Sequence, residues 1–225
     1  MGTVIIQEHT TLHPIAMIGE EAGICWGADT TSTHKNIKRG KSCLKSGHLR
    51  TAEYPVVYMV LDGYSARVMR EFYTHIAGAP TRLQASTRYI DYEHGFDYII
   101  PHTIENNPEA REIYVQNMII TADNLRRLDE CGIPREASAN LLPLGMTSKM
   151  VVKRNFRTLM TMSNQRMCSR AYWEFRELFS DIAKALSEYS VEWEELVNEY
   201  FMPKCELYGY CPEEHSCGMY PKKGE

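Results

Sequence analysis

The stretch PVVYMVLDGYSARVMREFYTHIAGAP, residues 55–80, carries the clearest structural signal in the chain. Its apolar start, residues 55–61, is rich in valine and predicts a β-strand, and Asp62-Gly63 predicts the turn that follows it. Ser65 is a suitable N-cap for a helix that ends at the Gly-x-Pro break, Gly78–Pro80. The core-facing stripe of that helix follows the i, i+3, i+4, i+7 spacing and is formed by Met69, Phe72, Tyr73 and Ile76. A strand that leads into an amphipathic helix is therefore predicted.

Polar side chains on both sides of the break predict an anion site. Beyond the break, polar and apolar residues alternate, and the polar set is Arg82, Gln84, Ser86 and Arg88. In an extended backbone alternate side chains point the same way, so these four would share one face. Guanidinium groups and a hydroxyl match the geometry of a phosphate, and the preceding helix can bring Arg70 to the same place. The segment from Arg70 to Tyr89 is therefore predicted to bind an anion.

Further elements are predicted along the second half of the chain. A helix starts at Asn107-Pro108, continues to Leu128 with an apolar stripe and ends at Cys131-Gly132. Pro134 opens a short helix, and residues 147–152 predict a strand.

The last three predicted helices begin at polar caps, namely Asn155, Ser169 and Ser190. The first presents Phe156, Leu159, Met160 and Ser163 on one side. The second is long and amphipathic, with a predicted core of Tyr172, Phe175, Leu178, Phe179, Ile182 and Leu186. The third is acidic.

Composition limits the class of protein. A chain of 225 residues with 44% hydrophobic content can form one large domain, and the only candidate boundary separates residues 1–204 from a tail at 205–225. The net charge of -4 argues against a general nucleic-acid surface. Neither a membrane span nor a signal peptide is visible, so a cytoplasmic protein is expected.

The seven cysteines are dispersed over the chain, which favours reduced thiols. The tail is a local exception, because Cys205, Cys211 and Cys217 lie close together with His215 between the last two. Their spacing fits none of the short CxxC zinc patterns, and no metal ligand is assigned. A metal or redox role and a loose C-terminal appendage both stay open.

Three blocks of sequence, taken in order, resemble the flavin-dependent thymidylate synthases over residues 47–186. The first is GHLRTAE at residues 47–53, and the second is the Arg70 to Tyr89 segment. The third begins with IPRE at residue 133 and continues through LLPL at 141 and RNFRTLM at 154 to Arg166 and Trp173-Glu174. The first forty residues match too loosely for any site to be placed there.

The resemblance implies an α+β subunit with a central antiparallel sheet flanked by helices. It implies a homotetramer with shared active sites that converts dUMP to dTMP. In that family 5,10-methylenetetrahydrofolate gives the carbon, and FAD reduced by NADPH carries the hydride. The expected partners are therefore small molecules, without nucleic acid or membrane.

Site residues follow from the same resemblance. The substrate dUMP would contact Arg70, Glu71, Gln84, Ser86, Arg88 and Arg166. Among these, Arg166 would be catalytic, because a fixed cation beside the pyrimidine favours ionisation at N3 and stabilises the charge that develops on the ring. The cofactor would contact His48, Arg50, Thr74, His75, Arg82, Asn155, Arg157 and Thr161.

The sequence departs from the family at its flavin signature. Thr74-His75-Ile76 stands where the family has Arg-His-Arg, and nine residues instead of seven precede Ser86. Ala139 and Glu71 replace a usual arginine and glutamine. We expect Arg82 and Arg50 to restore part of the missing positive charge.

Simpler interpretations exist for several of these residues. Arg70 and Arg88 would also suit surface ion pairs, and His75 would also suit a helical pair with Glu71. Asn155 caps a helix with or without flavin. The alternative functions are a related flavoenzyme that modifies another pyrimidine nucleotide or transfers a hydroxymethyl group, and a non-catalytic nucleotide-binding relative.

Overall fold

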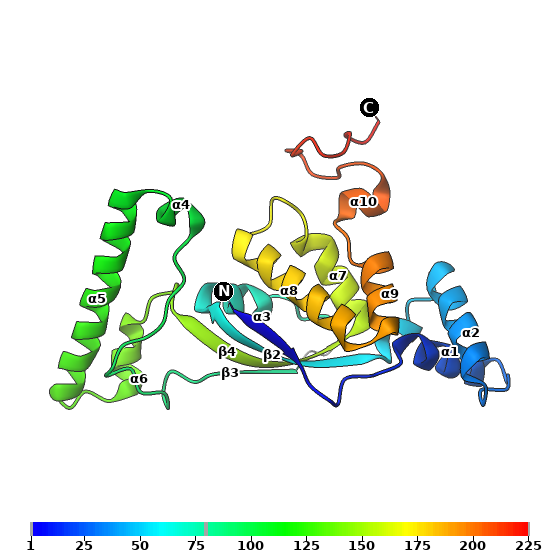
Figure 1. Cartoon of the computed structure of the whole chain (residues 1–225), viewed down its shortest axis with the longest axis horizontal. Coiled ribbons are helices and arrows are strands. Elements are labelled where there is room, and N and C mark those ends of the chain that lie inside the picture. Colours follow the sequence, from blue (N-terminus) through cyan, green and yellow to red (C-terminus); the bar gives the residue numbers. More distant parts are fainter. Residues whose placement is uncertain (1, 79–80, 225) are drawn as a thin grey trace. The chain divides into compact units, whose positions relative to one another are not determined.

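The computed structural model describes residues 2–78 and 81–224 (Figure 1). The chain divides into two compact units. Unit 1 consists mainly of Leu61–Thr74 and Leu83–Val151, and unit 2 consists mainly of Val4–Val60, His75–Arg82 and Val152–Glu225.

A mixed α+β architecture with a central antiparallel sheet is confirmed. The strands are β1 (Thr3–Ile6), β2 (Val56–Ser65), β3 (Thr81–Gln84) and β4 (Thr147–Asn155), in the order β1-β2-β4-β3 (Figure 1). The two long strands are central, and alternate side chains along them are buried, as the period of two requires. The buried set includes Val57, Met59, Leu61, Met150 and Val152.

The first predicted strand is longer than expected, because the chain does not turn at Asp62-Gly63. Strand β2 continues to Ser65, and Gly63 accommodates the local backbone with a φ of +76°. Ser65 then caps helix α3 (Ala66–Tyr73) by accepting a hydrogen bond from the Val68 amide at 3.1 Å. The N-cap prediction is confirmed, and the turn prediction is wrong.

Helix α3 ends at Tyr73, before the predicted end. The Thr74 amide and hydroxyl both donate to the Glu71 carbonyl, at 3.1 and 2.7 Å, and this tightens the last turn and closes the helix. Phe72 is buried as predicted, but Ile76 is 73% exposed, so its assignment to the core stripe is wrong. Pro80, the second half of the predicted break, lies outside the described residues.

The alternating segment after the break is extended only at its start. Within β3, Arg82 and Gln84 are partly buried while Leu83 is 74% exposed, as the predicted alternation requires. The chain then turns, since the Ser86 carbonyl accepts hydrogen bonds from the amides of residues 89 and 90. Arg88 therefore lies in a turn, and its expected place on one extended face with Arg82 is wrong.

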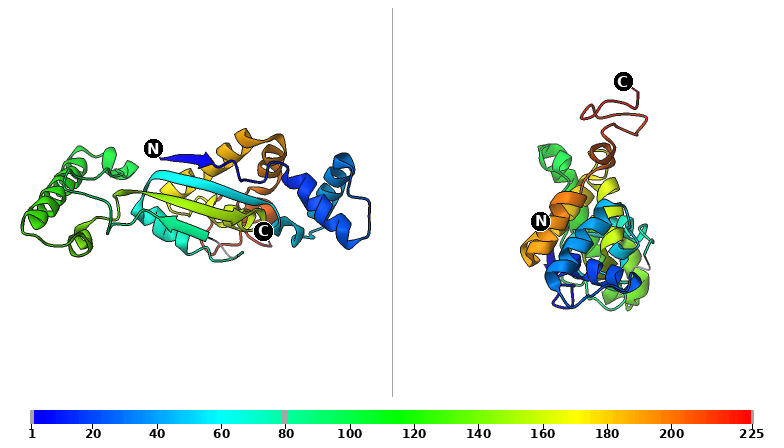
Figure 2. Two further views of the ribbon diagram at one scale, coloured as in Figure 1. Left: turned by 90° about the horizontal axis from the view of Figure 1, so that it is seen from below. Right: turned by 90° about the vertical axis from the view of Figure 1, so that its right-hand side faces the viewer.

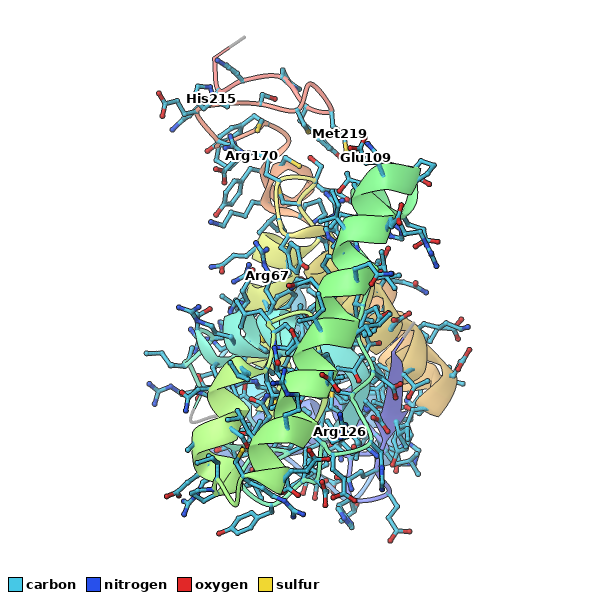
Figure 3. The ribbon with its side chains drawn as sticks, turned by 90° about the vertical axis from the view of Figure 1, so that its left-hand side faces the viewer. Arg67, Glu109, Arg126, Arg170, His215 and Met219 are labelled. Carbon is cyan, nitrogen blue, oxygen red and sulfur yellow. The ribbon has the colours of Figure 1, made fainter. Side chains whose placement is uncertain are left out.

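Helices α4 (His102–Glu105), α5 (Pro108–Glu130) and α6 (Arg135–Ser138), with the short turn η2 (Ala139–Leu141), complete unit 1. Asn107 caps α5 by accepting from the Ala110 amide at 3.1 Å, and the predicted boundaries hold. Figure 3 shows α5 with Glu109 near its start and Arg126 near its end. The buried face of α5 is narrow, and Ile113, Ile119 and Ile120 are exposed.

Unit 2 begins with a helical pair that the sequence did not predict. Helices α1 (Pro14–Cys25) and α2 (Thr33–Lys45) lie side by side (Figure 2). Their backbones approach at two glycines: a Cβ on Gly19 would lie 1.8 Å from the Asn36 carbonyl oxygen, and one on Gly40 would lie 2.2 Å from that of Ile15. The short turn η1 (Thr51–Glu53) follows.

The C-terminal helices of unit 2 are α7 (Phe156–Arg166), α8 (Trp173–Tyr189), α9 (Val191–Tyr200) and α10 (Lys204–Tyr208). Asn155 and Ser190 cap α7 and α9, as predicted. Ser169 does not cap α8, because the Cys168 carbonyl accepts from the Ala171 amide in a turn and the helix starts later. The aromatic core joins Phe156, Phe175, Phe179, Trp193 and Phe201. None of the helices in the described residues is long and apolar enough to cross a membrane.

Candidate functional site

A cavity of about 570 Å³ in unit 2 lies beside residues 47–53, the GHLRTAE block that contains His48. It brings together three residues that the sequence assigned to the cofactor: His48, Arg50 and Arg157. Arg157, in the first turn of α7, forms an ion pair with Glu53. We call this the histidine-block cavity.

The local backbone explains why His48 and Arg50 face one space. Gly47 adopts a φ of +74° after α2, a conformation that ends helices and that glycine reaches without strain. The His48 amide then bonds the Cys43 carbonyl, and the Thr51 hydroxyl bonds the His48 carbonyl at 2.8 Å. The chain folds back and places residues 47–51 along one wall.

No sequence pattern pointed to the residues on the other wall of this cavity. Glu21 and Cys25 reach it from α1, and Tyr54 reaches it from the end of η1. A lone acid, thiol and phenol in weakly patterned segments resemble ordinary surface residues, and only the packing of α1 against α2 brings them here.

Arg166, the predicted catalytic residue, is held by two neighbours in unit 2. Its Nε donates to Nε2 of His75 at 2.9 Å. Its guanidinium carbon lies 4.4 Å from the centre of the Phe175 ring, which is a cation–π distance. An imidazole and an aromatic face therefore both contact the guanidinium of Arg166.

The imidazole of His75 is neutral at physiological pH. Burial, followed by the charges of Arg166 and Arg154, lowers its pKa to about 4. A neutral ring can present Nε2 as an acceptor, which the hydrogen bond from Arg166 requires. The helical pairing with Glu71 is not the role seen for His75, because α3 ends before it.

The segment after His75 lies on the first turn of α7. The Thr158 hydroxyl donates to the Ala77 carbonyl at 3.3 Å, while Asn155 accepts from the Thr158 amide at 2.9 Å. A Cβ on Gly78 would lie 2.2 Å from the Thr158 hydroxyl oxygen, so only glycine fits there without movement. Asn155 is thus a structural cap whose side chain also reaches residues 77–78.

Two arginines of unit 2 place like charges near each other. Arg154, on β4, is 1% exposed. Its burial and the nearby charge of Arg82 lower its pKa to about 10. A negative charge close to two such arginines offsets their mutual repulsion. Arg154 was not among the predicted site residues, since a single arginine in a strand gives no signal of burial.

Two predicted cofactor threonines make local backbone hydrogen bonds. The Thr161 hydroxyl donates to the Arg157 carbonyl at 3.1 Å, one turn back along α7. Thr74 belongs to unit 1 and closes α3. Their cofactor role stays a prediction.

The expected phosphate residues of dUMP lie close in sequence within unit 1. Gln84 Nε2 donates to the Ser148 hydroxyl at 3.2 Å, and the Ser86 hydroxyl accepts from the Arg88 amide at 3.3 Å. The side chain of Arg88 pairs with Glu136 at 3.4 Å, and both are more than 60% exposed. An exposed pair of this kind is weak, so Arg88 can exchange its carboxylate for a phosphate.

Arg70 and Glu71 lie in the last turn of α3, also in unit 1. Arg70 is exposed and Glu71 is partly buried. Among the described residues, no group of three or more His, Cys, Asp or Glu side chains is arranged to hold a metal ion.

Known proteins are similar in sequence to most of this chain. The family model described as "Thymidylate synthase complementing protein" matches residues 8–190. A flavin-dependent thymidylate synthase from Nitratidesulfovibrio vulgaris is 31% identical over 193 residues, which cover 80% of this chain and 75% of that protein. The corresponding protein of Thermococcus onnurineus is 30% identical over 177 residues, covering 74% of this chain and 69% of its own.

Solved structures with low identity share the fold. Thymidylate synthase X from Helicobacter pylori, crystallised with FAD and dUMP, aligns with a TM-score of 0.67 at 18% identity. The alignment covers 88% of this chain and all of that one. A UMP/dUMP methylase, PolB, from Streptomyces cacaoi bound to 5-Br dUMP aligns with a TM-score of 0.73 at 16% identity, over 89% and 96% of the two chains.

Proposed function

The chain belongs to the flavin-dependent thymidylate synthase family, and we propose that it converts dUMP to dTMP with 5,10-methylenetetrahydrofolate as carbon donor and FAD reduced by NADPH as hydride carrier. The single observation that carries this proposal is the family match over residues 8–190, which includes all the residues proposed for the site. Arg166, set by His75 and Phe175, then supplies a fixed cation for the reaction.

Arg166 is proposed to contact the pyrimidine. The uracil ring is a weak nucleophile at C5, and negative charge develops on N3 and the ring carbonyls as C5 attacks. An arginine remains protonated throughout and stabilises that charge without a proton transfer of its own. His75 accepts from Nε, and this hydrogen bond fixes the plane of the guanidinium of Arg166.

The residues of unit 2 fit FAD. Its diphosphate is an anion, and the partly buried Arg82 and the buried Arg154 place two positive charges near each other. The histidine-block cavity adds His48, Arg50 and Arg157 on a concave surface. When bound, FAD supplies hydride chemistry that no side chain provides. Asn155, Thr161, Thr74 and His75 are proposed as its further contacts.

Arg82 and Arg50 are proposed to compensate for the missing arginines of the flavin signature. The charge of Arg82 lowers the pKa of Arg154, which supports a role for Arg82 near that residue. Arg50 lines the same cavity as His48, which supports a role for Arg50 there. The two substitutes lie in different parts of the sequence, so their contributions to FAD binding should be separable.

The phosphate of dUMP is proposed to bind Ser86 and Arg88, with Gln84, Arg70 and Glu71 contributing to the nucleotide. The turn at Ser86 supports this, because it gathers a hydroxyl and an exposed guanidinium within three residues. A phosphate accepts two charge-assisted hydrogen bonds from one guanidinium, which the weak pair with Glu136 does not prevent.

We also propose a homotetramer with shared sites and a cytoplasmic location. The exposed isoleucines of α5 support an interface between subunits, because Ile113 and Ile120 share one helix face and apolar side chains gain from burial. Light scattering on the purified chain gives the mass of the oligomer directly.

The proposed domain is residues 1–204, followed by the cysteine-rich tail at 205–225.

Tritium release tests the proposed activity. Protein, FAD, NADPH, methylenetetrahydrofolate and dUMP labelled with tritium at C5 should release tritiated water and form dTMP, identified by mass. A colourless protein that FAD does not stabilise, with no tritium release, would support the non-catalytic alternative and refute the proposal.

A second candidate substrate is favoured by one comparison. The similar fold of a UMP/dUMP methylase makes modification of UMP, or of another pyrimidine nucleotide, the main alternative within flavin enzymology. Replacing dUMP with UMP in the same assay separates the two. Product mass also distinguishes a transferred methyl group from a hydroxymethyl group.

A further inference from the structure

Four of the seven cysteines line one cavity of about 640 Å³ in unit 2. They come from three segments: Cys168 follows α7, Cys205 lies in α10, and Cys211 and Cys217 lie in the last part of the chain. Figure 3 shows Arg170 beside this last segment, which carries His215 and Met219. We call this cavity the thiol pocket.

The tail is attached to the body of unit 2 at this pocket. Arg170 donates from Nη1 to the His215 carbonyl at 2.6 Å. The Cys211 amide donates to the Pro221 carbonyl at 2.7 Å, which closes the tail on itself. Both Cys205 and Cys211 are only 9% exposed, although most of residues 205–224 are exposed. Cys205 and Cys211 therefore face inward, whereas most other residues of the tail face solvent.

The charge of the pocket favours thiolates over a metal cation. Its lining carries four cationic side chains and one acidic one: Arg166, Arg170, Arg176, Lys204 and Glu213. A positive environment stabilises a thiolate and attracts anionic reagents. It opposes a divalent cation, and within the described residues the four thiols do not form a metal-ligand group.

The four thiols are not equivalent. Cys217 is exposed, and hydrogen bonds from the Ser169 side chain and the Met219 amide, with a smaller effect of the Arg170 charge, lower its pKa. Burial raises the pKa of Cys205, and the neighbouring Cys168 and Cys211 raise it further. Accessible, low-pKa thiols beside a second thiol are typical of cysteines that react reversibly with disulfides.

The geometry points to Cys168 as the second thiol. Cys168, Ser169 and Cys217 all line the thiol pocket, and Ser169 directly follows Cys168 in the chain. Cys168 is partly exposed and lines the same pocket, whereas Cys205 and Cys211 are buried.

We propose that the thiol pocket is a thiol–disulfide exchange site in which Cys217 is the reactive thiol and Cys168 the resolving one, and that it takes anionic low-molecular-weight disulfides. The Cys217 thiolate attacks one sulfur of the disulfide, forms a mixed disulfide and releases one thiolate. Cys168 then loses its proton to solvent and attacks the Cys217 sulfur, which releases the second thiolate. The two protein thiols are oxidised by two electrons to one disulfide, and the small disulfide is reduced to two thiols.

The first test measures which thiol reacts. Full-length protein is mixed with 5,5′-dithiobis(2-nitrobenzoate), an anionic disulfide, and the released thiolate is followed over time. We expect a fast release of two equivalents of thiolate, one from the attack by Cys217 and one from the attack by Cys168, which disappears in Cys217→Ser and remains in Cys131→Ser, a matched control because Cys131 is also exposed. The fast phase should be about tenfold faster than the phase assigned to Cys131. Equal rates for Cys217 and Cys131 would overturn the proposal.

The charge preference is tested with two small disulfides. Oxidised glutathione carries net negative charge and cystamine carries positive charge. In the wild-type protein, the ratio of the Cys217 rate to the Cys131 rate should therefore be higher with oxidised glutathione than with cystamine. Arg170→Gln should reduce that preference. A preference for cystamine would contradict an electropositive site.

The resolving step is tested by peptide mass mapping after treatment with oxidised glutathione. The wild type should yield a Cys168–Cys217 disulfide, and Cys168→Ser should keep glutathione attached to Cys217. A disulfide between other cysteines, or a preparation whose thiols are unreactive until a chelator removes bound zinc, would refute the assignment. These measurements need neither FAD nor dUMP, so their outcome is independent of the proposed synthase activity.

Discussion

Arg166 and His75 are 91 positions apart in the sequence and share one hydrogen bond of 2.9 Å, in which the guanidinium Nε donates to the imidazole Nε2. The bond requires a neutral ring, and the environment keeps the ring neutral by lowering its pKa to about 4. His75 is therefore best understood as the residue that positions Arg166. The family signature assigned it to the flavin, and the two roles are separable by mutation.

Replacing His75 by alanine should lower kcat about tenfold, because a hydrogen bond to a charged group is lost and Arg166 is no longer held in one direction. Glutamine, whose side-chain oxygen can replace Nε2 as acceptor, should recover much of the loss. Steady-state kinetics with separate kcat and KM values check this. His94→Ala is a suitable control, since His94 is 92% exposed in unit 1. Equal activity of the alanine and glutamine variants would argue against positioning through this acceptor.

The stability of the protein should fall with acidification as His75 is protonated. Its pKa is 6.5 in the unfolded chain and about 4 in the folded one, so the unfolded state binds the proton first as pH falls. The neutral ring of His75 makes its full contribution to the free energy of unfolding above pH 6.5, and this contribution is lost as the pH falls from 6.5 to 4. Because the ring is partly exposed, we expect only about 1–2 kcal/mol. Urea unfolding across this pH range should show that the free energy of unfolding falls more steeply for the wild type than for His75→Gln. Parallel pH dependences of the two proteins would contradict the assignment.

Removing the charge of Arg82 should separate FAD binding from folding. Arg82→Met keeps the side-chain length and removes one of the two like charges, so the flavin-free protein should stay folded, as thermal unfolding would show. Affinity for FAD should fall about tenfold, since a charge-assisted contact is lost. Flavin fluorescence titration measures this, with Arg111→Met as a control cation in unit 1. Unchanged FAD affinity would refute the proposed compensation.

Arg88→Ala should affect ligand binding and leave stability nearly unchanged. The pair with Glu136 is exposed, so its loss should change the free energy of unfolding by less than about 0.5 kcal/mol. Binding of dUMP should weaken roughly tenfold or more, whereas binding of deoxyuridine, which lacks the phosphate, should not change. Calorimetric titration with both ligands tests this. Glu136→Ala breaks the same ion pair and should retain dUMP binding; equal losses for dUMP and deoxyuridine in Arg88→Ala would place Arg88 away from the phosphate.

Gly19→Ala should destabilise the α1–α2 pair by about 1–3 kcal/mol, because the added Cβ overlaps the Asn36 carbonyl. Glu20→Ala, at the neighbouring exposed position, is the control. Thermal unfolding measures both. Glu21 and Cys25 reach the histidine-block cavity from the same helix, so the variant should also weaken FAD binding. A fully stable Gly19→Ala protein would show that the helices can separate without cost.

Local signals in the sequence predicted much of the fold. The caps at Ser65, Asn107, Asn155 and Ser190 all form as expected, because an N-cap hydrogen bond joins residues three positions apart. The helical pair of α1 and α2 was not predicted, since glycines weaken the helical signal and only tertiary contact explains their presence. The early end of α3 and the late start of α8 have another cause, because local hydrogen bonds at Thr74 and at Cys168 replace the expected helical turns.

The predicted site residues also divide into those that short sequence spacings group together and those that only packing brings together. His48 and Arg50 could be grouped from sequence because they are two positions apart, and Arg157 joins them only through the packing of α7. Arg154 was missed, because a buried arginine in a strand cannot be distinguished from a surface one by its neighbours.

The sequence alone determined the family, the helix caps and the identity of the arginines available for an anion, because these depend on residue types and short spacings. The tertiary structure determined that Arg166 donates to His75, that the charge of Arg82 acts on the buried Arg154 and that four distant thiols share one pocket. Such contacts join residues far apart in the chain, so they depend on the path of the backbone and on the burial that shifts each pKa.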